Sequence, residues 1–239
     1  MTRRFVVAVT GASGATYAVR LLDVLTAAGC DVDLSISPAG REVLERELDL
    51  RVDLERFDPA MLMLDRRRYG EDEKLKSVRA LADVSSEDSN VLGVASGEPG
   101  AIRYHHHGDL AAPIASGSFL TDGMVICPCS MGTLGAIVHG TTANLIHRAA
   151  DVHLKERRRL VVVPRETPLS LIHLENMVRV KRAGAHVLPP VPGFYLKPRS
   201  IDEVCDFIVG KILNLLGIEH ELFAPWDGSI PPAPRSGDE

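Results

Sequence analysis

Arg165 and Glu166 stand side by side directly after the apolar, β-branched run of residues 161–163 and Pro164. Such a run is typical of a strand covered on both faces of a sheet, and ligands of open α/β sheets bind beyond the carboxyl ends of the strands. A guanidinium and a carboxylate in that place can hold a phosphate and move a proton. Taken alone, the pair is equally consistent with two solvated charges in an ordinary loop.

A second anion site is indicated near the amino terminus. The strand-like run of residues 5–9 is followed by Gly11 and Gly14 and then by a helical pattern to about residue 28. Unpaired backbone N–H groups point outward at such a helix start. The next strand-like run, residues 32–36, ends in Ser37, where a dinucleotide-binding fold places a carboxylate for the ribose. We therefore expect a mononucleotide such as FMN.

Other residues that could meet a phosphate lie at a helix start and on one helix face. Ser130 and Thr133 open a helix, which makes a further phosphate-capable amino terminus. Arg148 and Lys155 are seven apart on the helix expected for residues 144–159, so they share a side, although solvated charges are the usual explanation. Glu47 ends the helix that begins at Ser37 and Pro38, and from its position alone we interpret it as a solvated charge.

Metal chemistry is not indicated. Cys127 and Cys129 are two apart, a poor zinc spacing with no second pair elsewhere, so we interpret them as core thiols. The histidines at residues 105–107 cannot all face one ion on a regular strand, because successive side chains alternate. The chain also lacks an adjacent Asp pair of the kind that holds Mg²⁺ on a diphosphate. We expect no metal in the site.

The composition fits one globular domain. The chain has 239 residues, 45% of them hydrophobic and 25% charged, and can bury one good core. Its net charge of −5 gives no basis for binding nucleic acid or an anionic membrane. No apolar run approaches the roughly 20 residues needed to span a bilayer, no signal-peptide pattern precedes the first strand, and the four cysteines form no disulfide framework. Cytoplasm is the expected compartment.

Five strand-like runs separated by helices predict an α/β fold with a doubly wound, mostly parallel sheet. We expect one flavoprotein domain over residues 1–225, with a surface insertion at about 53–108 and an arm at 226–239. Prolines hold Tyr195 in an extended loop at a strand's carboxyl end. Ser200 with Glu203 predicts a capping box for the last helix, which carries Lys211.

Six motifs, in order along the chain, resemble the UbiX/Pad-type flavin prenyltransferases. The resemblance covers nearly the whole chain apart from the insertion and the last dozen residues. The motifs are residues 10–15, 127–130, 148–151, 154–158, 163–168 and 192–195.

The resemblance implies a Rossmann-like or flavodoxin-like fold and an FMN site. It implies that a dimethylallyl group passes from dimethylallyl phosphate to N5 and C6 of reduced FMN, which forms a fourth ring. The prenylated FMN would serve a separate UbiD-type decarboxylase. The resemblance also implies a homo-oligomer, a dodecamer, with Glu47 near the flavin in part through a neighbouring subunit.

The resemblance also assigns roles to residues. The implied FMN contacts are Gly11, Ala12, Ser13, Ser37, Ser130, Met131, Gly132, Thr133 and Arg165. The implied donor contacts are Arg148, Lys155, Arg165, Glu166, Tyr195 and Lys211. The implied catalytic residues are Glu166, Glu47, Ser13 and Lys155. The sequence departs from the family at Lys211, where arginine is usual, and at Leu110, which stands in place of a tryptophan.

Two other functions remain open at this point. One is an FMN-dependent cysteine decarboxylase of the phosphopantothenoylcysteine type, although the Pro-Ala-Ser-Ala-Asn-Thr motif of that family is replaced here by residues 127–130. The other is an FMN carrier subunit that performs no chemistry.

Overall fold

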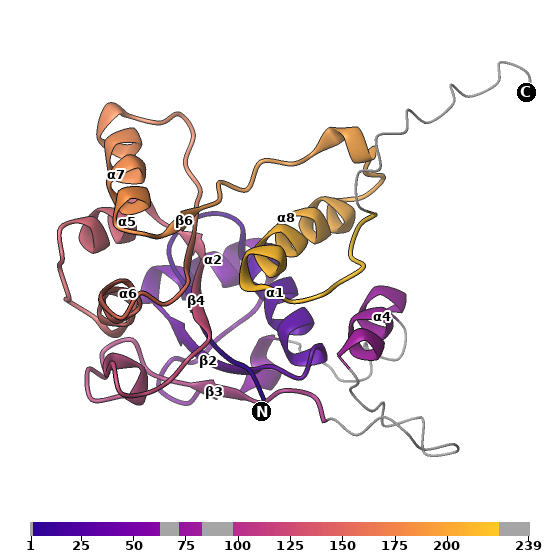
Figure 1. The fold of residues 1–239 in the computed structure, drawn as a ribbon, viewed down its shortest axis with the longest axis horizontal. Coiled ribbons are helices and arrows are strands. Elements are labelled where there is room, and N and C mark those ends of the chain that lie inside the picture. The colour runs from indigo at the N-terminus through magenta and orange to yellow at the C-terminus, as the bar shows by residue number, and fades with distance from the viewer. Residues whose placement is uncertain (1, 63–71, 83–97, 225–239) are drawn as a thin grey trace, which may run out of the picture.

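A computed structural model describes residues 2–62, 72–82 and 98–224 of the chain. Its centre is a six-stranded sheet in the order β3-β2-β1-β4-β5-β6, in which every neighbouring pair is parallel (Figure 1). This confirms the doubly wound sheet. The strands are β1 (Arg4–Val9), β2 (Asp31–Ile36), β3 (Ile102–Tyr104), β4 (Gly123–Cys129), β5 (Leu160–Pro164) and β6 (His186–Val187).

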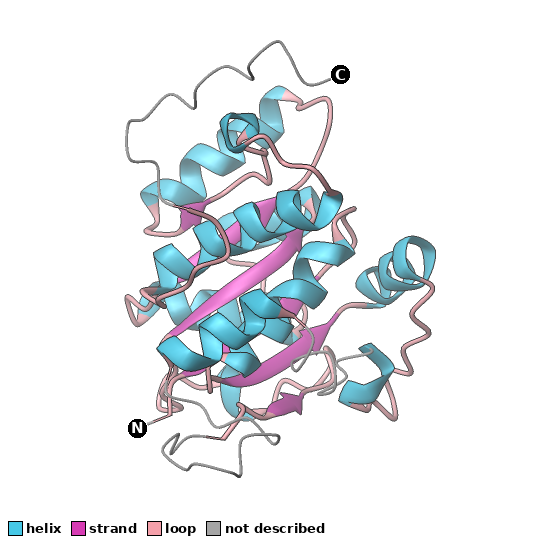
Figure 2. Ribbon diagram, turned by 90° about the vertical axis from the view of Figure 1, so that its right-hand side faces the viewer, coloured by secondary structure: helices cyan, strands magenta, loops and turns pink. Residues whose placement is uncertain are grey.

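Helices cover both faces of this sheet (Figure 2). One core cluster joins one face to α1 and α8, and a second joins the other face to α5 and α6. The α-helices are α1 (Ala15–Ala27), α2 (Pro38–Leu48), α4 (Glu73–Leu81), α5 (Met131–Val138), α6 (Leu145–Lys155), α7 (Leu171–Arg182) and α8 (Ile201–Leu216). Short 3-10 turns are η1 (Pro59–Leu62), η2 (Pro113–Ala115) and η3 (Phe194–Leu196).

The apolar strand sequences are explained by this double cover. In β1, Phe5, Val7 and Val9 face the first cluster, while Val6 and Ala8 face the second. All five side chains are at most 1% exposed. A strand with two buried faces needs an unbroken apolar run, since alternation would place polar groups in one of the cores.

Most helix starts follow the sequence signals. A side-chain oxygen of the N-cap residue accepts a backbone N–H in α2, α5, α6, α7 and α8. The predicted capping box of α8 forms only in part. The Ser200 hydroxyl accepts from Glu203 N at 3.2 Å, but the Glu203 carboxylate accepts from Arg199 N at 2.7 Å rather than from Ser200.

Two features differ from the sequence prediction. The helix expected to reach residue 159 ends at Lys155, because Arg157 turns into a left-handed conformation with φ 54°. The helix that Ser130 was expected to open does begin there, at Met131, directly after β4. The segment expected as an insertion supplies the edge strand β3, which pairs with β2, and helix α4, which packs on α1. The expected arm at 226–239 lies outside the described residues.

Candidate functional site

The chain order of the sheet reverses between β1 and β4, and the crevice at such a reversal is the usual ligand site of open α/β folds. Loops from three strands are tied together there. The Thr10 hydroxyl donates to Pro128 O and accepts from Ser130 N, both at 2.8 Å. Arg165 N donates to Cys129 O at 3.3 Å. The glycine turn, the Ser130 helix start and Arg165 therefore meet at one edge of the sheet.

The turn after β1 is shaped by close packing against α2. A Cβ on Gly11 would lie 2.4 Å from the Cβ of Ala39, and one on Gly40 would lie 2.5 Å from Val9 O. Such distances leave no room for side chains, so glycine is required at both positions. Gly14 has φ 120° and begins α1 without a side-chain cap of its own.

Glu47 provides the missing cap, and its interpretation as a solvated charge is wrong. Its carboxylate accepts from Gly14 N at 2.9 Å and from Ala15 N at 2.8 Å. Burial raises the pKa of Glu47, but hydrogen bonds from Ser13, Gly14 and Ala15 and the charge of Arg165 outweigh it and hold the pKa below its usual value. An ionised carboxylate is therefore fixed at the turn that holds Gly11, Ala12 and Ser13.

Two serines cap the other helices that begin at this edge. Ser37 Oγ accepts from Gly40 N at 3.0 Å, and Ser37 N donates to Val9 O at 3.0 Å. Ser130 Oγ accepts from Thr133 N at 3.2 Å and donates to the Thr133 hydroxyl at 3.0 Å. The starts of α2 and α5 thus lie close to the end of β1, with their remaining first-turn N–H groups available to an anion.

The first turn of α5 leaves space beside the backbone. A Cβ on Gly132 would have no heavy atom within 4 Å, whereas Met131 beside it is buried. A flat ligand could lie against the chain at Gly132. Backbone donors, hydroxyls and open space next to a glycine suit the phosphate and ring of a mononucleotide, so the residues present fit FMN.

The cations of α6 gather along the loop of residues 115–119. Arg148 Nε donates to Ala115 O at 3.0 Å, and its Nη1 pairs with Asp151 at 2.8 Å. Lys155 pairs with Glu156, and a Cβ on Gly117 would lie 3.0 Å from Lys155 Nζ. Arg148 and Lys155 therefore follow one loop, as their spacing predicted, and each is paired with a nearby acid of its own segment.

Two charged residues end β5 and face solvent. Arg165 and Glu166 are both exposed, and the Glu166 carboxylate accepts from Thr167 N at 3.1 Å. Exposure agrees with the simple loop interpretation, but Arg165 also contributes to the electrostatics of Glu47 across the crevice. Arg165 thus belongs to the same charge environment as the glycine turn.

Tyr195 and Lys211 lie in an aromatic group on and beside α8. The rings of Tyr195 and Phe207 meet edge to face, with centroids 6.1 Å apart. Lys211 Nζ lies 5.5 Å from the ring centroids of both Phe207 and Phe223. Lys211 is partly buried between these rings, in a cation–π arrangement, rather than simply solvated. Leu110 is 52% exposed.

Two residues of this region were missed by sequence reasoning. Tyr17, on the first turn of α1, covers the turn so closely that a Cβ on Gly14 would lie 2.8 Å from its ring. Burial, chiefly, raises the pKa of Tyr17, with Glu47 and Arg165 among the charges that act on it. Arg158 donates to the carbonyl oxygens of Gly117 and Phe119. The only sequence signals were an aromatic residue after a glycine turn and an extra arginine after a helix.

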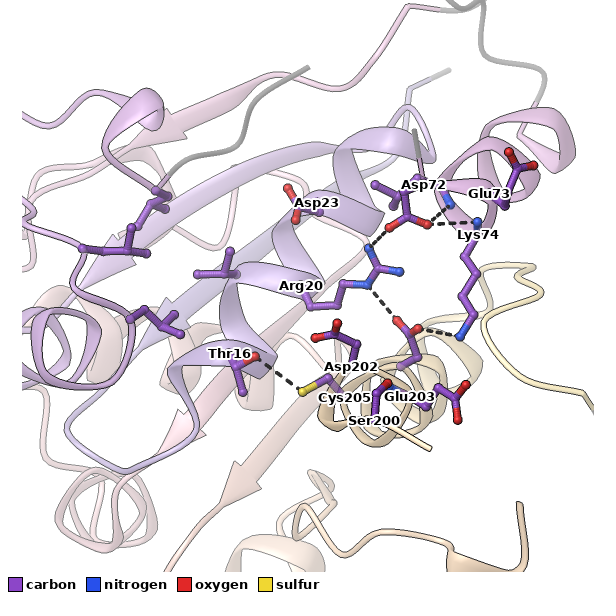
Figure 3. Close-up of a pocket in the computed structure, with 16 residues that line it drawn as sticks. Thr16, Arg20, Asp23, Asp72, Glu73, Lys74, Ser200, Asp202, Glu203 and Cys205 are labelled. Atoms are coloured by element: carbon purple, nitrogen blue, oxygen red, sulfur yellow. Dashed lines mark hydrogen bonds and ion pairs between the residues drawn. The ribbon is translucent and has the colours of Figure 1, made fainter. Parts of the chain in front are cut away.

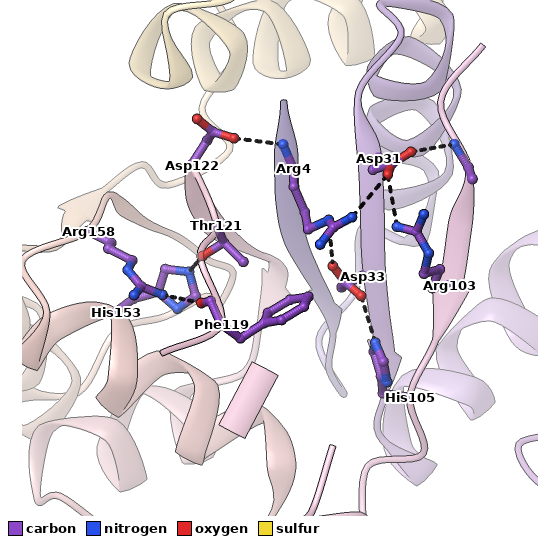
Figure 4. Close-up of polar contacts among 11 residues, drawn as sticks. Arg4, Asp31, Asp33, Arg103, His105, Phe119, Thr121, Asp122, His153 and Arg158 are labelled. Atoms are coloured by element: carbon purple, nitrogen blue, oxygen red, sulfur yellow. Dashed lines mark hydrogen bonds and ion pairs between the residues drawn. The ribbon is translucent and has the colours of Figure 1, made fainter. Parts of the chain in front are cut away.

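The described residues contain no group of three or more His, Cys, Asp or Glu side chains that could hold a metal. His105 instead pairs with the buried Asp33 at 2.7 Å, beside Arg4 on β1 (Figure 4). Cys127 and Cys129 are fully buried, and burial raises the pKa of both thiols. The interpretation of these cysteines as core thiols is confirmed.

A cavity of about 650 Å³ lies between α1, α4 and α8 (Figure 3). Its wall carries a charge network in which Arg20 bonds Asp72 and Asp206, each at 2.7 Å, and Lys74 bonds Asp206 at 2.8 Å. These pairs satisfy one another and anchor α4 to α1 and α8. No helix in the described part of the chain is long and apolar enough to cross a membrane.

Comparisons with known proteins agree with this geometry. A family model described as Flavoprotein matches residues 1–213. The flavin prenyltransferase UbiX of Halalkalibacterium halodurans is 44% identical over 222 residues, which are 93% of this chain and 92% of that protein.

Solved structures are also similar to this chain over nearly its whole length. The crystal structure of AnUbiX (PadA1) in complex with FMN and dimethylallyl pyrophosphate is 40% identical, with a TM-score of 0.75. The match covers 96% of this chain and 100% of that one. The dodecameric FMN-dependent UbiX-like decarboxylase from Escherichia coli O157:H7 is 34% identical, with a TM-score of 0.71, over 94% of this chain and 100% of that one.

Proposed function

Because this chain belongs to the family of UbiX flavin prenyltransferases, we propose that it joins a dimethylallyl group to N5 and C6 of reduced FMN, with dimethylallyl phosphate as the donor. The observation that carries the proposal is the meeting, at the switch point of the sheet, of three loops that offer anion donors. Arg165 and Glu166 stand at the end of the neighbouring strand. A flavin and a phosphate donor both find partners there.

FMN would be held mainly by backbone and hydroxyl groups. The starts of α2 and α5 offer N–H groups to its phosphate, and Gly132 leaves room for its ring. Reduced FMN supplies the nucleophilic N5 and C6 positions when bound. The residues we assign to it are Gly11, Ala12, Ser13, Ser37, Ser130, Met131, Gly132, Thr133 and Arg165.

The donor would be held mainly by charged side chains. Arg148, Lys155 and Arg165 would meet the charge that builds on the departing phosphate, without a metal. Tyr195 would shield the allylic cation with its ring face, and Lys211 would add a further positive charge. Arg148 and Lys155 each rest on a local partner that a phosphate could replace, Asp151 for Arg148 and Glu156 for Lys155.

Glu166 is the residue we assign to proton movement. Its carboxylate is exposed and holds only the N–H of its own neighbour, Thr167, among the hydrogen bonds of the described chain. It could take up the proton that leaves the flavin as the second carbon bond forms, either directly or through the departed phosphate. Glu47 and Ser13, hydrogen-bonded to each other at the turn, would act on the flavin from the other side.

We also propose a homo-oligomer, a dodecamer, in which a second copy covers α7. This helix packs on α5 and β6, while Leu171 and Ile172 in its first turn are 70% and 69% exposed. Large exposed apolar side chains grouped on one helix indicate an interface. The helix directly follows the loop that carries Arg165 and Glu166, so the covering copy would lie beside the site.

The oligomer proposal is tested by light scattering on a Leu171→Glu, Ile172→Glu variant. We expect a smaller particle than the wild type. Leu81→Glu, on α4, is the control because Leu81 is 44% exposed on a different helix. An unchanged particle size in the double variant, or an equal change in the control, would contradict the assignment of α7.

The proposal also covers the use of the product and the cellular compartment of the protein. We propose that prenylated FMN passes to a UbiD-type decarboxylase, which would use it as cofactor. We place the protein in the cytoplasm, and the four cysteines support this because all are buried free thiols, as is usual where disulfides do not form.

One experiment separates the three candidate functions. Purified protein is incubated anaerobically with reduced FMN and either dimethylallyl phosphate or dimethylallyl diphosphate, with and without chelator. We expect the flavin to gain the mass of the prenyl group, equally with chelator. A parallel sample contains oxidised FMN, which can accept the two electrons of cysteine oxidation, and a peptide with a carboxyl-terminal cysteine. Release of CO₂ from that peptide without a flavin mass change would favour the decarboxylase, and neither reaction would favour the carrier.

A further inference from the structure

Thr10 is a buried polar residue at the end of an apolar strand. It directly follows β1, and only 1% of it is exposed. Its hydroxyl makes two hydrogen bonds, one as donor to Pro128 O and one as acceptor from Ser130 N, each at 2.8 Å. Thr10 N also donates to Pro128 O at 3.2 Å. No apolar side chain of the same shape could replace this hydroxyl, since one group both donates and accepts.

These bonds occur where the regular ladder has ended. The paired residues of β1 and β4 finish at Ala8 and Ile126, and between Ile126 and Cys129 the register of β4 against β5 also shifts. Beyond that point Thr10 holds the two segments together, through its backbone N–H to Pro128 O and through the two bonds of its hydroxyl. The end of β4 is therefore held to the end of β1 by one threonine.

Thr10 joins two segments that both supply proposed FMN contacts, the glycine turn of residues 11–13 and the start of α5. Thr10 O accepts from Ala12 N at 2.9 Å in the glycine turn. Ser130, on the other side, caps α5 through Thr133 N at 3.2 Å. A shift of Ser130 relative to the turn would change the distance between two rows of N–H donors that must meet one ligand.

We infer that Thr10 is a positioning residue for the flavin site, whose hydroxyl sets the separation of the glycine turn and the start of α5. The inference rests on the proposed binding of FMN at these loops. Thr10 need not touch the flavin. Its effect is to keep the donors of Ser130 and its helix in register with those of residues 11–13, because a small misplacement of binding groups costs much affinity.

The test compares three variants. Thr10→Val keeps the shape and removes the hydroxyl, Thr10→Ser keeps the hydroxyl and removes the methyl group, and Thr26→Val removes another buried hydroxyl. Thr26 is 5% exposed and bonds Leu22 O at 2.9 Å within α1, away from the crevice. Should Thr10→Val fail to fold, Thr10→Cys, which keeps a weak donor, replaces it with a smaller expected effect of about three-fold.

Two measurements are made on each variant. The first is amide hydrogen exchange at Ser130 in the protein without FMN, and the second is the dissociation constant of FMN by fluorescence titration well below the melting temperature. We expect Thr10→Val to lose protection at Ser130 and to bind FMN about ten-fold or more weakly. Thr10→Ser should stay within about three-fold of wild type, and Thr26→Val should lose thermal stability without losing FMN affinity.

Wild-type FMN affinity in Thr10→Val would overturn the inference. So would equal losses in Thr10→Val and Thr10→Ser, which would assign the effect to packing of the methyl group, or an equal loss in Thr26→Val, which would assign it to general destabilisation. Failure of prenyl transfer in a wild-type protein that binds FMN would instead count against the proposed function. Retained protection at Ser130 in Thr10→Val would also overturn the inference, and this measurement needs no ligand.

Discussion

The flavin half of the site, residues 10–14, 37 and 130–133, consists of backbone N–H groups and short hydroxyl side chains. The donor half, Arg148, Lys155 and Glu166, consists of long charged side chains, and Arg165 is assigned to both ligands. The flavin half is joined by contacts between distant segments, such as Glu47 with Gly14. The donor half is paired locally, as in Lys155 with Glu156. Exposed local ion pairs contribute about 0–1 kcal/mol, so a phosphate can exchange with them easily.

This difference indicates a division of labour. Groups fixed by the backbone are in place before the ligand arrives, which limits the entropy lost on binding. Cations on flexible side chains can follow the negative charge that builds on the phosphate as it departs. Mutations in the two halves should therefore affect different quantities, the affinity for FMN in one and the affinity for donor or the rate in the other.

The largest effect is expected for Glu166→Gln. An amide cannot accept the proton released by the flavin, so single-turnover formation of prenylated FMN should fall by about 10²–10⁴-fold, while FMN affinity stays unchanged. The product is followed by mass spectrometry. Glu175→Gln, an exposed glutamate on α7, is the control and should react normally. A wild-type rate in Glu166→Gln would remove Glu166 from the mechanism.

The stability of the protein should depend on pH through His153 on α6, the helix that carries the donor cations. His153 is 1% exposed, and its Nε2 lies 2.9 Å from the Thr121 hydroxyl (Figure 4). Its Nδ1 lies 2.7 Å from Ala149 O. Burial lowers its pKa from 6.5 to about 4. Between about pH 4 and pH 6.5, His153 is therefore protonated in the unfolded chain and neutral in the folded chain.

Stability should consequently fall as pH drops from about 6.5 to about 4, by up to about 3 kcal/mol, and this contribution should change no further below that range. Urea unfolding at several pH values measures it. His153→Gln should flatten the slope over this window, whereas His139→Gln should not, because His139 is exposed. An identical slope in wild type and His153→Gln would show that other groups cause the pH dependence.

Gly132→Leu should separate affinity from stability in the flavin half. The side chain would occupy the open space at the start of α5, so FMN binding should weaken about 10- to 100-fold by steric overlap. The helix itself should not suffer, because leucine is a better helix former than glycine. Gly135→Ala, in the same helix, is the control. Unchanged FMN affinity in Gly132→Leu would place the flavin elsewhere.

The smallest effect is expected at Lys211, where the family usually has arginine. Guanidinium stacks on aromatic rings and binds phosphate through two parallel bonds, so Lys211→Arg should tighten donor binding by about three- to ten-fold. Lys211→Ala should weaken donor binding more strongly and leave FMN affinity unchanged. Calorimetry measures both ligands. If neither substitution alters donor affinity, Lys211 serves only to pack between Phe207 and Phe223.

Most of the fold could be predicted from the sequence, because local sequence patterns agree with the elements that form. Buried strands appear as apolar runs, and the caps at Ser37, Ser130 and Ser200 need only neighbouring residues. The edge strand β3 was missed because it has three residues and only one strand neighbour. A short edge strand of this kind leaves no distinct hydrophobic pattern.

The site was less accessible to sequence reasoning where it depends on long-range packing. Glu47 reaches Gly14 across 33 positions, and no local pattern distinguishes such a cap from a solvated charge. Thr10 acts through hydrogen bonds with a loop more than a hundred residues away, at Pro128 and Ser130. Spacing along the chain showed Arg148 and Lys155 on one side of a helix, but not which acids would pair with them.

The most direct test of this division is a pair of calorimetric titrations on wild type and Lys155→Gln. Oxidised FMN is added first, and dimethylallyl phosphate is then added to the FMN-loaded protein, so that binding is measured without reaction. We expect Lys155→Gln to bind FMN within about two-fold of wild type and to bind the donor about ten-fold more weakly, from loss of one charge-assisted contact. Equal losses for both ligands, or no loss for the donor, would contradict the separation of the two halves.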